Sequence, residues 1–193
     1  MTTIRGRLAL TAVAAVMVTA GCTSPTGSTA PQHTSTPVTV ADLLSAPVPE
    51  LCKHEPGNLV NGLLPHQDPQ RGEVRVAKRK YPDGDYWVAF GDLTGDGVDD
   101  GALVTECSAG GVPWPATVQI YSAGSARLGG VDLSDVTHGR EVVTGLAIAD
   151  GVAQVWWTTQ GPDDPECCGT VHMTADLRWD GSKVVTENVK RAN

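Results

Sequence analysis

The segment 91–104 (GDLTGDGVDDGALV) holds the residues with the clearest potential for chemistry in this chain. Asp92, Thr94, Asp96, Val98 and Asp100 fall at alternate positions of this segment, with a glycine at position 97. Calcium takes six to eight oxygen ligands, and protein loops supply them at alternate positions around a glycine that permits a sharp turn. Val98 would contribute its backbone carbonyl. The spacing therefore indicates calcium as a candidate cofactor, with a structural rather than a catalytic role.

The same segment resembles the strand–loop–strand calcium loop of the FG-GAP and VCBS repeats. It departs from that pattern at Thr94, where those families carry Asp or Asn, and the motif occurs once, whereas a propeller needs several blades. The resemblance thus implies a loop between two strands and not a propeller. The alternative is a turn whose carboxylates accept hydrogen bonds from their own backbone. The residues leave both hypotheses open.

A basic cluster precedes the acidic segment in the chain, and in it charged residues alternate with β-branched residues. Its members are Arg71, Arg75, Lys78, Arg79 and Lys80, interleaved with Val74 and Val76. One interpretation is a surface for anionic lipid headgroups or wall polymers. The other is a solvated strand face beside acidic neighbours, which is the commoner role of such a run.

Tryptophans offer the remaining hint of a binding surface. Trp156 and Trp157 are adjacent, so in a strand one must point inward and the other outward. Trp114 stands between two prolines. An outward tryptophan can stack on a sugar ring, while core packing or protection of a sheet edge is the alternative.

No catalytic residue is predicted. His54, His66, His138 and His172 show no metal-ligand spacing, and Ser125 lacks the flanks of a nucleophile elbow. Catalytic groups assemble in space rather than in sequence order, so a hydrolase of wall or extracellular substrates stays an alternative to a binding domain.

Residues 1–21 are predicted to be a lipoprotein signal peptide. Arg5 and Arg7 precede the apolar run Leu8–Val18, which is too short to span a hydrocarbon core of about 30 Å. The zone Thr19–Cys22 resembles a bacterial lipobox, with Thr19 in place of the usual Leu. That resemblance implies diacylglycerol on Cys22 and a location on the outer face of the plasma membrane.

The export context bears on the other four cysteines, Cys52, Cys107, Cys167 and Cys168. An even number in an exported chain predicts two disulfides. A bond between neighbours strains the intervening peptide, so we expect Cys167 and Cys168 each to pair with Cys52 or Cys107. A Cys₄ zinc site is the rival hypothesis.

Residues 22–39 are rich in Ser, Thr and Pro, which predicts a disordered tether. Residues 40–193 then form one β-rich domain. A short helix is expected over 40–46, capped by Thr39. Asp-Gly pairs at 83–84, 150–151 and 180–181 separate β-branched runs and predict hairpins, as does the pair of runs 117–121 and 127–133. We expect eight or nine largely antiparallel strands in a curved sheet, sandwich or small barrel.

The net charge is −8, which disfavours nucleic acid as a partner. Several segments, among them LCKHEPGNLVNGLLP, GDLTGDGVDDGALVTEC, GGVPWP, CCGT and RWDGSKVV, are similar to uncharacterised actinobacterial lipoproteins of the LppP/LprE type. That family brings no assigned reaction. The resemblance therefore implies location and architecture, namely a lipid-anchored envelope protein, rather than chemistry. Our first hypothesis for its function is a domain that binds or scaffolds a wall polymer or an envelope protein, with a calcium-stabilised spacer as a further alternative.

Overall fold

The computed structural model describes residues 36–65, 67–79, 84–108, 114–165 and 167–192. The protein is mainly β, with 49% strand and 7% helix, and its antiparallel sheets do not close into a barrel. The elements are α1 (Val40–Leu43), β1 (Pro47–Val48), β2 (Gly57–Asn58), the 3₁₀ turn η1 (Pro69–Arg71), β3 (Glu73–Val76), β4 (Val88–Gly91), β5 (Asp100–Ser108), β6 (Thr117–Tyr121), β7 (Arg127–Asp132), α2 (Ser134–Thr137), β8 (Val142–Ala149), β9 (Val152–Thr159), β10 (Val171–Trp179) and β11 (Val184–Arg191).

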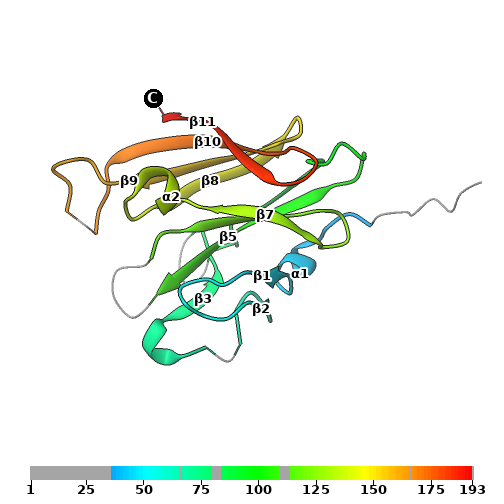
Figure 1. Ribbon diagram of the computed structural model, residues 1–193, viewed down its shortest axis with the longest axis horizontal. Helices are drawn as coiled ribbons and strands as arrows, with labels where there is room; N and C mark the ends of the chain where they lie inside the picture. The colour runs from blue at the N-terminus through cyan, green and yellow to red at the C-terminus, as the bar shows by residue number, and fades with distance from the viewer. Residues whose placement is uncertain (1–35, 66, 80–83, 109–113, 166, 193) are drawn as a thin grey trace, which may run out of the picture. The chain divides into compact units, whose positions relative to one another are not determined.

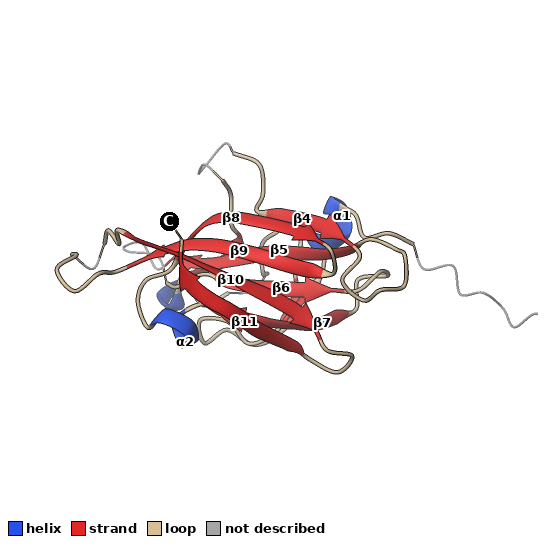
Figure 2. Ribbon diagram, turned by 90° about the horizontal axis from the view of Figure 1, so that it is seen from above, coloured by secondary structure: helices blue, strands red, loops and turns tan. Residues whose placement is uncertain are grey.

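Two main sheets form a sandwich, one of the three architectures that the sequence predicts. The first sheet has five strands in the order β3-β5-β6-β7, with β4 also paired to β5. β3 and β4 share one edge of β5, β3 along residues 105–108 and β4 along residues 100–103. The second sheet has four strands in the order β11-β10-β9-β8, and it lies over the first (Figures 1 and 2). The two-residue strands β1 and β2 pair with each other below the first sheet (Figure 1).

The sandwich has two apolar cores, one on each face of the five-stranded sheet. The first lies between the two sheets and includes Val104, Ile120, Val155 and Trp157. The second lies on the opposite face, where side chains of α1, β1 and the following loops cover β3, β5 and β6. Because β5 and β6 are covered on both faces, both are buried almost without interruption, whereas β9 alternates buried and half-buried residues.

Three of the predicted turns join neighbouring strands. Asp150 and Gly151 connect β8 and β9 with positive φ at both residues, as a type I′ hairpin requires. Runs 117–121 and 127–132 pair as β6 and β7. Asp180 begins a four-residue loop between β10 and β11, in which its carboxylate accepts from the backbone of Ser182 and Lys183.

The hairpin predicted at residues 83–84 does not join β3 directly to β4. β3 and β4 both pair with β5. The segments that extend them, 77–79 and 85–87, pair with each other around a bridge of Lys78 with Tyr86, where the N–H of Arg79 donates to the carbonyl of Asp85 at 2.8 Å and that of Trp87 to the carbonyl of Ala77 at 2.9 Å. Asp83 lies outside the described residues. Pairing of β3 with β5 is favoured because it places Val74 and Val76 in the second core, where both are almost fully buried.

The N-terminal helix is confirmed and is shorter than expected. Thr39 caps α1 with a reciprocal capping box, in which its side chain and that of Asp42 each accept from the other's backbone N–H. The folded domain begins earlier than the predicted boundary at residue 40, because Val38 is buried in the second core and donates its N–H to Asp99. A second short helix, α2, was not predicted. Among the described residues, no helix has the length and apolarity needed to cross a membrane.

Candidate binding surface around Trp114

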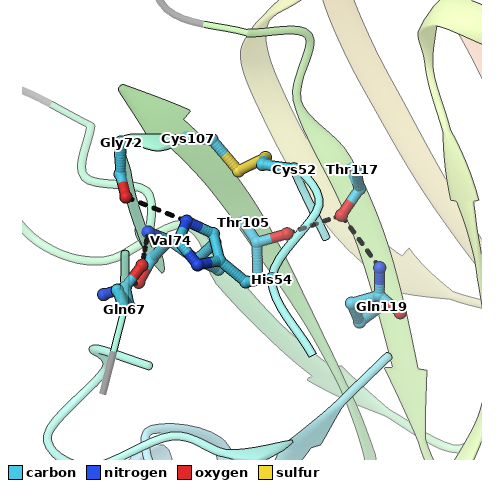
Figure 3. Close-up of a disulfide and its surroundings, with 9 residues drawn as sticks. All are labelled: Cys52, His54, Gln67, Gly72, Val74, Thr105, Cys107, Thr117 and Gln119. Atoms are coloured by element: carbon cyan, nitrogen blue, oxygen red, sulfur yellow. Dashed lines mark hydrogen bonds between the residues drawn. A yellow bond between two sulfur atoms is a disulfide. The ribbon is translucent and has the colours of Figure 1, made fainter. Parts of the chain in front are cut away.

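Trp114 lies between β5 and β6 in the chain and is positioned by contacts with Cys107 and Lys53. Its backbone N–H donates to the carbonyl of Cys107 at the end of β5, at 3.0 Å. Cys107 is disulfide-bonded to Cys52 (Figure 3), and the ammonium of the next residue, Lys53, lies 5.9 Å from the centroid of the Trp114 ring. The disulfide therefore brings Lys53 from a separate loop to this ring. The Trp114 side chain is 37% exposed.

Three hollows in the surface meet at Trp114. A broad one of about 580 Å³ is lined by Trp114, Pro115, Gly139 and Arg140. A second, of about 230 Å³, runs past Lys53 toward Asp132 and Ser134. The third is a small cavity between the sheets, described below. We call the area around the first two hollows the Trp114 surface: Lys53, Trp114, Pro115, Asp132 and Arg140.

The broad hollow continues into a polar depression of about 410 Å³, lined by Thr137, His138, Gly139, Arg140, Gln160 and Asp164. Asp164 accepts hydrogen bonds from the backbone of Gly161 and from the backbone and hydroxyl of Thr170. These bonds, that from Gly161 first, lower the pKa of Asp164 below its ordinary value. The depression therefore presents a fixed carboxylate at neutral pH.

Glu141 is the most unusual polar residue near this surface, because it is only 2% exposed. Its Oε1 accepts hydrogen bonds from the backbone N–H of Gly139 at 2.7 Å, from Thr137 Oγ1 at 2.8 Å and from Thr159 Oγ1 at 3.1 Å. Trp157 Nε1 in turn donates to Thr137 Oγ1 at 3.0 Å. The network ties α2 and β9 to Glu141, the residue just before β8. Glu141 Oε2 is also buried but has no hydrogen-bond partner among the described residues.

The acidic loop joins β4 to β5, as its resemblance to a strand–loop–strand motif implies. Asp92 Oδ1 accepts from the backbone N–H of Gly95 and Asp96, and its Oδ2 accepts from Gly97. Asp96 Oδ1 accepts from Val98. The glycines at 95 and 97 have positive φ, which lets the backbone wrap around Asp92. These are the contacts of a loop that satisfies its own backbone.

The carboxylate of Asp100 is engaged by backbone N–H groups of two loops. It is fully buried, and its Oδ2 accepts from the backbone N–H of Leu93 and Thr94, both at 2.8 Å. Its Oδ1 accepts from Ala123 in the β6–β7 loop, at 2.7 Å. Among the described residues, no group of three His, Cys, Asp or Glu side chains is placed to hold a metal. The arrangement does not fit a calcium cage and favours the turn hypothesis, and calcium binding stays a prediction for a melting experiment.

The basic cluster is largely paired. Arg75 contacts Glu106 at 2.9 Å and Glu73 at 3.1 Å, and Arg71 contacts Asp68 at 3.3 Å. The ammonium of Lys78 lies 5.3 Å from the Tyr86 ring centroid, and the guanidinium of Arg79 lies 4.8 Å from that of Trp87. Lys80 lies outside the described residues. These contacts favour the interpretation as a strand face beside acidic neighbours.

The predicted cysteine pairing is wrong. Cys52 is bonded to Cys107 across 55 positions, with the two Cα atoms 6.5 Å apart. The neighbours Cys167 and Cys168 are bonded to each other in the exposed loop after β9. The prediction failed because it considered only the strain of a neighbouring pair, whereas the fold places Cys52 beside β5 and leaves the loop after β9 elsewhere.

The two adjacent tryptophans follow the strand pattern, with Trp157 fully buried and Trp156 half-buried on the other face. Of the histidines that the structure describes, His54 is buried and its Nε2 contacts the carbonyl of Gly72 at 2.9 Å (Figure 3). In the described part of the chain, no histidine is hydrogen-bonded to a serine, threonine or carboxylate side chain. His66 and Cys22 lie outside it.

Comparison with protein-family models, with curated proteins and with solved structures finds no match to this chain. Sequence reasoning identified Trp114 but missed Glu141 and Arg140. No local signal marks them, since Glu141 is a single acidic residue before two valines and its burial follows from α2, β8 and β9 meeting around it.

Proposed function

We propose that this chain is a lipid-anchored protein of the cell envelope whose folded domain binds an envelope glycan through the Trp114 surface. The leader and Cys22 support the anchoring, because the lipobox-like zone follows a short apolar run. The observation that carries the binding proposal is the exposed Trp114 ring, which borders both hollows and has charged and polar groups around it.

The chemistry of this surface matches that of a sugar. A pyranose ring presents a face of C–H groups and a rim of hydroxyls, so it stacks on an aromatic ring while its rim forms hydrogen bonds. Trp114 offers the aromatic face. Lys53, Asp132 and Arg140 line the adjoining hollows and offer charged groups for the rim. Both donors and acceptors are represented, as hydroxyl groups require.

The charge of the protein narrows the class of partner. With a net charge of −8, the chain repels polyanions at long range. The cations around Trp114 are accompanied by Asp132 in one hollow and by Asp164 in the adjoining depression, so the region is mixed in sign. A neutral glycan suits such a surface better than nucleic acid or a polyphosphate.

The binding proposal is tested by sedimenting the protein with purified, insoluble wall glycan. We expect Trp114→Ala to weaken binding at least tenfold, because the stacking face is lost. Trp179→Ala is the matched control, since Trp179 is a half-buried tryptophan on β10 and lines none of the hollows described here. Equal binding by wild type and Trp114→Ala, with both folded, would contradict the proposal.

The anchoring proposal has a separate test. We expect Cys22→Ala to move the protein from the membrane fraction into the medium, because the thiol that carries the diacylglycerol is absent. Membrane retention of the Cys22→Ala protein at the wild-type level, measured by fractionation and immunoblotting, would refute lipidation at this residue.

A further inference from the structure

The third hollow at Trp114 is a small cavity of about 120 Å³ between the two sheets. Its wall combines two aromatic rings, a buried carboxylate and an apolar floor. Its lining includes Trp87, Val104, Trp114, Ala116, Glu141 and Val143. By the volume of liquid water per molecule, roughly 30 Å³, the cavity has room for about four non-hydrogen atoms.

Glu141 makes this cavity more than a packing defect. One carboxylate oxygen accepts three hydrogen bonds, which hold the side chain in place. The other, Oε2, is buried without a partner among the described residues. Buried polar atoms are nearly always hydrogen-bonded in proteins, so an orphaned acceptor fixed by three bonds to its twin indicates a missing donor. Because Glu141 lines the cavity, a group that enters the cavity is a candidate for this donor.

The rest of the lining defines the chemistry of that group. Ala116, Val104 and Val143 require an apolar portion, while Glu141 Oε2 requires an N–H or O–H donor. An acetamido group satisfies these conditions with four non-hydrogen atoms: a methyl, an amide N–H, and a carbonyl for which the Arg79 guanidinium on the wall is a donor.

We propose that this cavity receives the N-acetyl group of an amino sugar, whose amide N–H donates to Glu141 Oε2 while its ring stacks on Trp114. The inference rests on the proposed glycan binding and specifies its substrate class. It follows from the position of Trp114, which lines both the small cavity and the broad hollow. Glu141 thus recognises the acetamido group, whereas Trp114 stacks on the ring of any pyranose.

The test compares two neutral probes that differ in this group: the tetramer of β-1,4-linked N-acetylglucosamine and the matching tetramer of β-1,4-linked glucose. By isothermal titration with the mature chain, we expect the acetylated probe to bind at least tenfold more tightly. In Glu141→Gln the side-chain oxygen can still accept from Thr137, Gly139 and Thr159, but an NH₂ group replaces Oε2. We expect this variant to lose the preference and to keep the wild-type affinity for the glucose tetramer.

The outcomes separate the two proposals. If wild type binds both tetramers equally and Trp114→Ala weakens both, glycan binding holds and the N-acetyl assignment is overturned. A preference that survives in Glu141→Gln overturns it as well. If wild type binds neither tetramer, the N-acetyl assignment fails, while binding of wall glycan in the sedimentation assay still decides the broader proposal.

A second measurement covers the case in which Glu141→Gln does not fold. Crystals of the wild-type protein soaked with the N-acetylglucosamine tetramer are expected to show an acetamido nitrogen within hydrogen-bond distance of Oε2. Water alone in the cavity, with the sugar bound elsewhere or not at all, would overturn the assignment.

Discussion

Replacing Asp100 by Asn is expected to destabilise the domain strongly, although the change removes no carbon atom. The carboxylate is fully buried and accepts from three backbone N–H groups that belong to two different loops. A carboxamide has one acceptor oxygen. If that oxygen keeps the bonds from Leu93 and Thr94, the NH₂ group must face the N–H of Ala123, and donor meets donor.

The loss of stability in Asp100→Asn can be worked out from these hydrogen bonds. One lost hydrogen bond to a charged group costs about 1.5–3 kcal/mol, and a buried donor left without a partner costs about 1–3 kcal/mol. Removing the buried negative charge offsets part of this loss, because the desolvation penalty disappears. The net loss is therefore about 2–4 kcal/mol. For a domain of this size, that corresponds to a fall in Tm of about 5–15 °C.

Thermal unfolding followed by circular dichroism measures this effect. Asp96→Asn is the matched control, because Asp96 is exposed in the same loop and its one described side-chain bond is to Val98. Its Tm should change by less than about 2 °C, as for most surface substitutions. If Asp100→Asn melts within that same range of the wild type, the assigned role of the buried carboxylate is refuted.

The same experiment decides the calcium hypothesis. Because Asp92 and Asp100 use both oxygens to hold backbone N–H groups, we expect equal melting of the wild type in excess calcium and in a chelator. A rise in Tm with calcium that Asp96→Ala abolishes would establish a cation site in this loop and contradict the turn interpretation.

Two further predictions concern covalent links and pH. Replacing Cys52 and Cys107 by Ala should lower stability by about 4 kcal/mol in urea unfolding, the chain-entropy value for their sequence separation of 55, whereas replacing the neighbours Cys167 and Cys168 by Ser should have little effect because they close no loop. Equal losses in both variants would contradict this assignment. The hydrogen bonds that lower the pKa of Asp164 stabilise the fold above the unfolded-state pKa near 4 and are lost as the pH falls through the lower folded-state value. The Tm difference between wild type and Asp164→Asn should therefore be constant above about pH 5 and shrink at lower pH; a difference that grows on acidification would contradict this.

Local features of the fold could be predicted because their causes are local. Thr39 caps α1 through a residue three positions away, and Asp150 with Gly151 forms the turn between β8 and β9 through its own φ angles. The alternation of residues around Val74 identified a strand, and two adjacent tryptophans had to face opposite sides. Each of these interactions lies within a few residues, so composition and spacing contain the necessary information.

The parts that failed, or that were invisible, depend on which segments meet in space. Local turn signals predicted one hairpin over 73–90, but only segments 77–79 and 85–87 pair with each other, whereas burial of their side chains places β3 and β4 against β5. Cysteine spacing cannot show that Cys52 lies beside the end of β5, and that contact decides the disulfide and the position of Lys53 at Trp114. An Asp in an acidic run looks like its neighbours until the β6–β7 loop covers it.

The sequence by itself determined the β class, the helix cap, the acidic strand–loop–strand connection and the prediction of an exported, lipid-bearing chain. Only the tertiary structure decided that Asp100 is a buried acceptor, that Glu141 has one satisfied and one orphaned oxygen, and that Trp114 stands where three hollows meet. The physical reason is that the role of a polar side chain is set by its partners and its burial. For Asp100 and Glu141, those partners include Ala123 and Thr159, which lie 23 and 18 positions away in the sequence and are brought close by the fold.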